Sequence, residues 1–135
     1  MRNKPAPMAL LFRICVYPSE HEKGLYTAHC LELDLIGEDK TFEGAIELLL
    51  EAIETQVSIH QRENSQLFFP APDFVWQRYN QARIAKRKIP EELTDRIFAR
   101  ANRRLGYSLE SGVNKRIENI VATKQVLDEC LAANK

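Results

Sequence analysis

The sequence has no run of about 18 apolar residues, the length that one helix needs to cross a bilayer. The apolar run near the start is interrupted by Arg13 and followed by Pro18 and charged residues, unlike a cleaved signal peptide. Phosphate-binding loops, dinucleotide fingerprints and nucleophile elbows are also missing. We therefore expect a cytoplasmic, non-enzymatic protein without a transmembrane helix.

Cysteine is scarce. The three cysteines are Cys15, Cys30 and Cys130. An odd number without close spacing argues against a disulfide framework and fits a reducing compartment. Cys15, His29 and Cys30 lie on neighbouring predicted strands, but His29 and Cys30 point to opposite faces. Since the hairpin is expected to place Cys15 opposite Thr27 or Ala28, we predict no metal site, and we predict no cofactor.

The formal net charge is zero, but the two halves of the chain differ. Residues 1–60 carry 5 basic and 10 acidic side chains, whereas residues 61–135 carry 14 basic and 9 acidic ones. The basic excess is densest between Arg83 and Arg104. Such a split suggests a half that faces a polyanion and a half with another task. Two solvated surfaces of different charge explain it equally well.

The first half has the periodicity of three strands and a long helix. Leu10 to Tyr17 alternates with one fully apolar face, and residues 25–33 form the second strand of a hairpin. Leu35 and Ile36 form a short third strand that Gly37 ends. Thr41 is the expected N-cap of an amphipathic helix that covers one sheet face. The apolar stripe of this helix is Ile46, Leu49, Leu50, Ile53 and Val57.

Two further helices are expected in the basic half, after a boundary near residues 81–88. The first opens at Pro90-Glu91-Glu92 and stops at Gly106. Its apolar stripe is Leu93, Ile97, Ala101 and Leu105. The second begins after Ser108, its expected N-cap. Its stripe is Val113, Ile117, Ile120 and Val121, continuing to Leu127 and Leu131. The predicted fold class is therefore α+β: a small antiparallel sheet with one covering helix, followed by a mainly helical tail.

Two stretches resemble modules of one family. Residues 24–54, GLYTAHCLELDLIGEDKTFEGAIELLLEAIE, resemble the N-terminal domain of HicB antitoxins. The matching residues are Gly24, Tyr26, Gly37, Thr41, Ala45, Glu51, Ala52 and Ile53. Residues 86–120 resemble a ribbon-helix-helix module, with a basic strand, Pro-Glu-Glu-Leu opening one helix and Gly-x-Ser-Leu opening the next. Together they cover about half of the chain, in the family's order.

The resemblance implies an antitoxin that binds and neutralises a small mRNA-cleaving toxin and represses its own operon. It implies a HicB-like domain over residues 1–80, a small sheet with a helix packed on it. Residues 81–135 would form a ribbon-helix-helix-like segment for DNA binding and dimerisation. The implied partners are a HicA-like toxin, double-stranded DNA and further copies of the chain.

DNA contact is expected from the ribbon-helix-helix resemblance. Paired strands of two chains would lie in the major groove, and the start of the second helix would hold a phosphate. The predicted DNA-binding residues are Lys86, Arg87, Lys88, Arg103, Arg104, Ser108, Leu109 and Glu110. The alternative is a helical hairpin used for oligomerisation, whose arginines are only solvated.

Toxin contact is expected on the polar side of the long helix. The predicted toxin-binding residues are Glu43, Glu47, Glu51 and Glu54. A toxin that holds RNA needs a basic surface, so an acidic helix face would complement it. Polar helix faces usually just face water, and that interpretation stays open.

Two other functions are weighed against the antitoxin. One is an orphan HicB-like oligomeric scaffold that has lost toxin, operator or both, which Arg87 on the inward face of the ribbon and Gly112 in the second helix favour. The other, ranked last, is a metal-dependent nuclease. Its acidic cluster would be Glu32, Asp34, Glu38 and Asp39.

Overall fold

The computed structural model describes residues 8–64, 66–85, 88–105, 107–108 and 113–131. The strands are β1 (Met8–Pro18), β2 (Tyr26–Cys30), β3 (Leu35–Asp39), β4 (Tyr107–Ser108) and β5 (Val113–Ala122). The helices are α1 (Phe42–Glu63), α2 (Asp73–Ile84), α3 (Glu91–Leu105) and α4 (Lys124–Val126), followed by the π-helical turn η1 (Leu127–Leu131). The predicted α+β class and its covering helix are confirmed.

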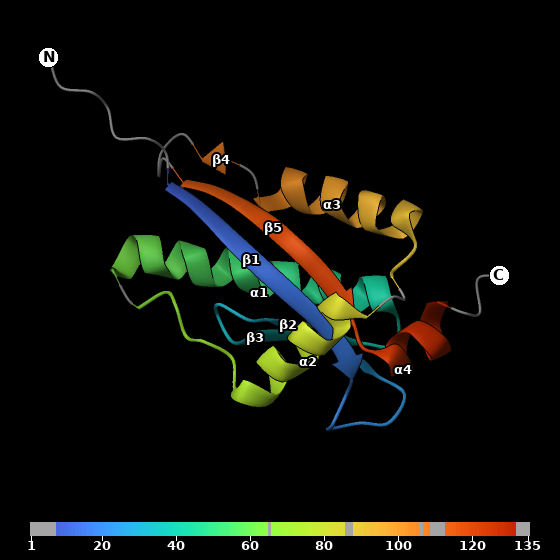
Figure 1. Cartoon of the computed structure of the whole chain (residues 1–135). Helices are drawn as coiled ribbons and strands as arrows, with labels where there is room; N and C mark the ends of the chain where they lie inside the picture. Colours follow the sequence, from blue (N-terminus) through green and yellow to red (C-terminus); the bar gives the residue numbers. More distant parts are fainter. Residues whose placement is uncertain (1–7, 65, 86–87, 106, 109–112, 132–135) are drawn as a thin grey trace, which may run out of the picture.

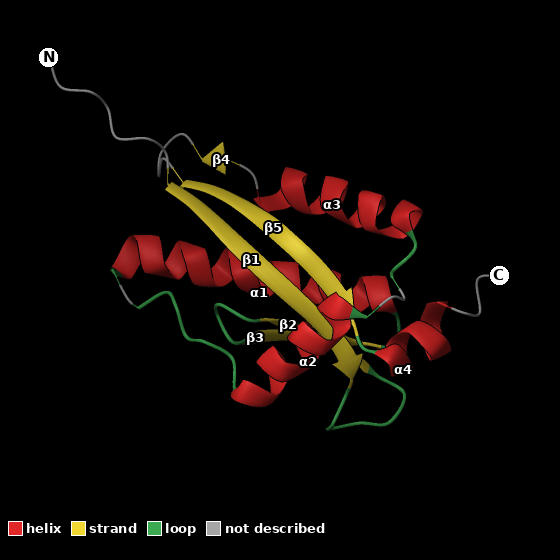
Figure 2. Ribbon diagram, in the orientation of Figure 1, coloured by secondary structure: helices red, strands yellow, loops and turns green. Residues whose placement is uncertain are grey.

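The strands form one sheet in the order β3-β2-β1-β5-β4 (Figure 2). β1 pairs antiparallel with β2, and β2 with β3, as expected for a hairpin and a short third strand. β1 also pairs parallel with β5, so the sheet is mixed, whereas a small antiparallel sheet was expected. The reason is that β5 comes from the C-terminal half and enters the sheet beside the first strand.

The register of the hairpin differs from the expected one. Cys15 lies opposite His29, not opposite Thr27 or Ala28, because the turn that joins β1 to β2 is centred near Glu22. Gly37 does not end the third strand but lies inside β3, where its buried backbone faces α1.

Each face of β1 belongs to a different core. The even-numbered side chains from Leu10 to Val16 are buried with α1 and α3 on one face. On the other face Cys15 and Tyr17 pack with α2, whose buried residues are Val75 and Tyr79. The sheet is therefore the middle layer, with α1 and α3 on one side and α2 on the other (Figure 1).

Helix α1 begins and ends as its sequence dictates. The Thr41 hydroxyl accepts a hydrogen bond from the Gly44 N–H at 3.0 Å, which confirms Thr41 as the N-cap. The helix ends at Asn64, which takes a left-handed φ of 51°. The predicted apolar stripe is buried against the sheet.

The predicted second helix of the tail is wrong, because residues 113–122 form strand β5. The register of β5 against β1 shifts by one residue, so that Phe12 pairs with Ile117 but Arg13 pairs with Asn119. This β-bulge lets Ile117 and Ile120, three positions apart, both face the same core. The apolar spacing that resembled a helix is that of a bulged strand. Ser108 is therefore not an N-cap but the second residue of β4.

The sequence leaves open whether residues 81–88 form a DNA-reading strand or continue the preceding helix. In the structure helix α2 runs on to Ile84, and Lys88 and Ile89 belong to no strand, so the described part of this segment follows the second alternative. Lys86 and Arg87 lie outside the described residues, as do Gly106, Leu109 and Glu110. The expected domain boundary after residue 80 falls inside α2, and residues from both halves share one hydrophobic core.

None of the helices in the described ranges has the length and apolar content needed to span a bilayer.

Candidate binding face of helix α1

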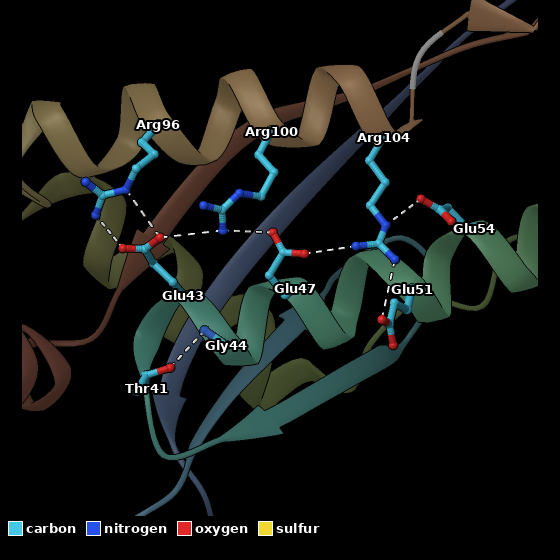
Figure 3. A network of polar contacts seen from close by, with 9 residues as sticks. All are labelled: Thr41, Glu43, Gly44, Glu47, Glu51, Glu54, Arg96, Arg100 and Arg104. Carbon is cyan, nitrogen blue, oxygen red and sulfur yellow. Dashed lines mark hydrogen bonds and ion pairs between the residues drawn. The ribbon is translucent and has the colours of Figure 1, made fainter.

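Helices α1 and α3 lie side by side on one sheet face and run in the same direction (Figure 3). Their facing edges carry opposite charges at helical spacing. The carboxylates of α1 are Glu43, Glu47, Glu51 and Glu54, and the guanidinium groups of α3 are Arg96, Arg100 and Arg104. We call this set the Arg–Glu ladder.

Two arginines bind the first two glutamates. Arg96 forms an ion pair with Glu43 through Nη2 and places its Nε 3.3 Å from the second oxygen of the same carboxylate. Arg100 Nη1 lies 3.0 Å from Glu47 Oε1 and 3.6 Å from Glu43 Oε2. Arg100 therefore bridges two successive glutamates of α1.

Arg104 binds three carboxylates at once. Its Nε lies 2.6 Å from Glu54 Oε1, its Nη1 2.9 Å from Glu47 Oε2, and its Nη2 3.4 Å from Glu51 Oε1. The hydrogen bond to Glu54 raises the pKa of Arg104 above its ordinary value, and the neighbouring carboxylates add to this. All the nitrogens of this planar group face acidic oxygens, the geometry in which arginine binds best.

The local sequence aligns the two rows. The Thr41 cap sets the start of α1 and places Glu43 in its first turn, near the positive end of the helix dipole. On α3, each ladder arginine directly precedes a residue of the buried stripe. Those buried residues are Ile97, Ala101 and Leu105. Burial of the stripe therefore sets the direction in which the arginines leave the helix.

The ladder is only partly shielded from water. The side chains of its arginines are 30% to 56% exposed, and Glu51 is 58% exposed. Ion pairs this exposed stabilise a fold weakly and are screened by salt. The ladder therefore mainly forms a charged surface. The helices are held on the sheet by the buried apolar residues of α1 and α3.

The structure brings some predicted site residues together and separates others. All four predicted toxin-binding glutamates and the predicted DNA-binding Arg104 belong to the ladder. Two other predicted DNA-binding residues, Lys88 and Arg103, do not belong to the ladder. Lys88 is exposed before the start of α3, and Arg103 is exposed near the end of α3. The ladder partners Arg96 and Arg100 were not among the predicted site residues. Their four-residue spacing with Arg104 is the signal that could have identified them.

The carboxylates weighed for a nuclease have separate partners. Glu32 binds Arg13 at 2.6 Å, Asp34 lies 2.6 Å from His29 Nε2, and Asp39 accepts from the Thr41 hydroxyl. Glu38 accepts hydrogen bonds from three other side chains. Across the described residues, no group of three or more acidic, histidine or cysteine side chains is placed to hold a metal ion.

A chain of three polar groups, of which Tyr17 and His29 are buried, crosses the hairpin. The Tyr17 hydroxyl lies 2.7 Å from His29 Nδ1, and His29 Nε2 faces Asp34. Both ring nitrogens of His29 therefore have a hydrogen-bond partner. Arg78 and Phe74 cover the Tyr17 ring. Tyr17 and His29 are each only 5% exposed, whereas the side chain of Asp34 is 42% exposed, so the chain leads from the core to the surface.

No family model, curated protein or solved structure matches this chain.

Proposed function

We propose that this chain is an antitoxin-like binding protein that uses the acidic face of α1 to hold a small, basic, mRNA-cleaving toxin in the cytoplasm. The Arg–Glu ladder carries the proposal, because the glutamates of α1 already bind arginines presented at four-residue spacing. A face that binds such a row within the chain has the charge and spacing to bind one on another protein. The resemblance of residues 24–54 to HicB antitoxins supports the same role.

The toxin would approach the open side of the ladder. Glu51 is the most exposed carboxylate of the ladder. Its distance of 3.4 Å from Arg104 is the longest of the three contacts that Arg104 makes with the glutamates. Leu48 is 43% exposed and lies three positions before Glu51, so the two share a helix face. An apolar side chain beside an open carboxylate is a suitable anchor for a basic partner. Binding there would not require α3 to leave the sheet.

Repression of its own operon is the second part of the proposal. It does not rest on the ribbon-helix-helix scaffold. Lys88 and Arg103 are exposed and form no ion pair within the described ranges, so they remain free to approach phosphates. Arg104 is held by the glutamates of α1 and contributes less. We therefore expect Lys88 and Arg103 to contact the phosphates of the DNA backbone.

The alternative is the orphan scaffold, and one observation favours it. Every glutamate of the ladder already has an arginine partner in the same chain. A face that is satisfied internally can serve the fold without any toxin.

Co-expression separates the two functions. The small protein encoded beside this chain's gene is expressed in bacteria, with and without the chain, and growth is measured. Growth arrest that the native chain relieves and the E51K/E54K variant does not relieve supports toxin binding by α1. The matched control is E22K/E63K, which makes the same charge change away from the ladder and should still relieve arrest. Toxin neutralisation through α1 is wrong if the neighbour causes no arrest, or if both variants act like the native chain.

DNA binding is tested by fluorescence anisotropy on the duplex directly upstream of the gene, with a scrambled duplex as control and salt varied. Preference for the native duplex that K86A/K88A abolishes supports a repressor. Equal and steeply salt-dependent binding to both duplexes indicates phosphate contacts without sequence readout.

A further inference from the structure

Strand β3 forms one edge of the sheet, at the opposite end from β4 (Figure 2). Among the described residues it pairs with β2 on one side and with no strand on the other. Its pairing with β2 is regular and its sequence contains no proline, so neither a bulge nor a missing donor interrupts the edge. An open edge of this kind can accept a strand from another chain.

The hairpin shows which backbone groups of β3 point outward. The Leu31 N–H donates to the Arg13 carbonyl, so these two residues form a hydrogen-bonded pair at the end of the β1–β2 ladder. Hydrogen-bonded pairs alternate along antiparallel strands, and this alternation, carried across β2, turns the backbone of Gly37 toward β2. The N–H and C=O groups of Ile36 and Glu38 therefore point away from the sheet, toward the open edge.

Two exposed apolar side chains flank this edge on opposite faces. A Cβ atom on Gly37 would lie 2.9 Å from the carbonyl carbon of Leu48, so Leu48 lies directly over Gly37 on the α1 side. Ile36, the neighbour of Gly37, points to the other face because side chains alternate along a strand. Leu48 is 43% exposed and Ile36 is 41% exposed. A strand that joined the edge with a helix beside it would bury apolar surface on both faces.

The acidic side chains of β3 do not guard the edge. Glu38 accepts hydrogen bonds from Thr27 on β2 and from two side chains of the loop between β1 and β2, so its carboxylate leans back over the sheet. The carboxylate of Asp39 accepts from the Thr41 hydroxyl at the start of α1. Both acids are thus held within the chain, whereas edge strands that keep other strands away project free charges.

A second copy of the chain fits this edge. When Gly37 lies opposite Gly37 of the second copy, Ile36 lies opposite Glu38 of that copy, and the outward backbone groups of both copies bond each other. Lys40 then lies opposite Asp34 of the second copy. Asp34 is 42% exposed, and Lys40 is exposed without an ion pair among the described residues. Opposite charges therefore meet at both ends of the paired strands, which stabilises such a pair.

Charge also selects the register. With the two-fold axis at Ile36, Glu38 would lie opposite Asp34 of the second copy. With the axis at Glu38, two Glu38 side chains would lie opposite each other. Like charges directly opposite destabilise paired strands, so the axis at Gly37 is favoured over both neighbours.

We propose that β3 pairs antiparallel with β3 of a second copy, which joins the two sheets into one around a two-fold axis at Gly37. Leu48 of each copy faces that of the other on the α1 side, and Ile36 packs against the second copy's strand on the opposite face. This interface lies apart from residues 81–135, to which the family resemblance assigns dimerisation. It goes beyond the proposed function and covers Leu48, so a toxin seated on that side chain would compete with the second copy.

Sedimentation equilibrium of the full chain tests the pairing. We expect a species of twice the 15.6 kDa of one chain, which dissociates on dilution. Hydrogen exchange followed by NMR then locates the interface. The amide protons of Ile36 and Glu38, which point to the open edge in a single chain, should be protected in the dimer and exchange freely after dilution.

A pair of lysine variants separates this edge from other exposed apolar positions. Ile36→Lys places a charge on the apolar flank of the edge and should weaken the dimer at least about tenfold. Leu11→Lys is the matched control, because Leu11 is 46% exposed on β1 and lies outside β3. It should dimerise like the native chain. Circular dichroism checks that both variants are folded.

An exchange of charges tests the two ends of the paired strands. Asp34→Lys alone sets lysines against each other, and Lys40→Glu alone sets carboxylates against each other, so each variant should dimerise weakly. An equal mixture of the two variants restores opposite charges at both ends and should associate more tightly than either variant alone. A folding defect cannot produce that recovery, so the test holds even though Asp34 also contacts His29.

The pairing is wrong if the chain stays monomeric at millimolar concentration, or if Ile36→Lys and Leu11→Lys affect the dimer equally. It is also wrong if the Ile36 and Glu38 amides exchange equally in dimer and monomer, or if the mixture associates no better than its components. None of these measurements involves the toxin, so failure of this interface is distinguishable from failure of toxin binding.

Discussion

A Cβ atom on Gly37 would lie 2.3 Å from the carbonyl oxygen of Ala45, so strand β3 and helix α1 touch through their backbones. Gly37→Ala must push the helix away from the sheet. We expect unfolding free energy to fall by about 1–3 kcal/mol, the usual cost of overpacking a core, as measured by urea denaturation.

Gly24 provides the control for that substitution. A Cβ there would meet no atom within 4 Å, although the φ of 91° is unfavourable for alanine. Gly24→Ala should therefore cost about 1 kcal/mol, from backbone strain alone. A Gly37→Ala variant as stable as the native chain would contradict the close backbone packing.

The Thr41 cap should be measurable in the same way. Thr41→Ala leaves the Gly44 N–H without its acceptor and should lower unfolding free energy by about 1 kcal/mol. Thr55, in mid-helix with its hydroxyl on the Glu51 carbonyl, is the matched control. Thr55→Ala should change stability by only a few tenths of a kcal/mol, roughly, because the position is exposed. Equal effects at both threonines would show that the cap contributes nothing specific.

The ladder should contribute a small, salt-sensitive amount. A double-mutant cycle with Glu47→Gln and Arg100→Gln, whose charged atoms lie 3.0 Å apart, should give a coupling of about 0.2–1 kcal/mol at low salt. The coupling should shrink in 1 M salt, where the Debye length is about 3 Å. A large coupling that salt leaves unchanged would mean that the pair is more shielded than its exposure indicates.

Glu38 should make stability depend on pH. Burial acts to raise its pKa, but hydrogen bonds from His21, Thr27 and Ser19 outweigh this and lower the pKa below its ordinary 4.5. A lowered folded-state pKa adds stability above pH 4.5 that is lost as pH falls through the folded value. The difference in unfolding free energy between the native chain and Glu38→Gln should therefore be largest near neutral pH and become smaller at acidic pH. Urea midpoints across that range measure it, and a constant gap would contradict the assignment.

The buried cysteines should be unreactive in the folded protein. Burial raises the pKa of Cys15 and of Cys30 to about 12 each, so few thiolates form at neutral pH. In a Cys130→Ser variant, a thiol reagent such as Ellman's should titrate neither residue until urea unfolds the chain, and then both. Rapid reaction under native conditions would show that the core opens.

Much of the fold follows from local sequence patterns. The alternation of β1, the cap and stripe of α1 and the opening of α3 at Pro90 were all predictable, because each signal lies within a few residues. Strand β5 was not, because its bulge places Ile117 and Ile120 on one face at a spacing typical of helices. Only the partner strand β1, far away in sequence, decides between the two.

For a similar reason, the two charged rows of the candidate site could be predicted from the sequence, but their pairing could not. The glutamate row of α1 is visible as a polar helix face, and the basic excess of α3 is visible in its composition. Their pairing depends on α1 and α3 lying on the same sheet face, which no local pattern encodes. Residues such as Glu47 and Arg104 were therefore assigned to two different external partners, although they bind each other.

The parallel pairing of β1 with β5 also has a consequence during synthesis. Met8 pairs with Val113, 105 positions later, so at an elongation rate of about 5–20 residues per second β1 waits about 5–20 s for its neighbour. Throughout that interval a strand rich in apolar residues presents an open edge, which other chains can join. Nascent chains that stall before residue 113 should therefore be the ones that aggregate or recruit chaperones.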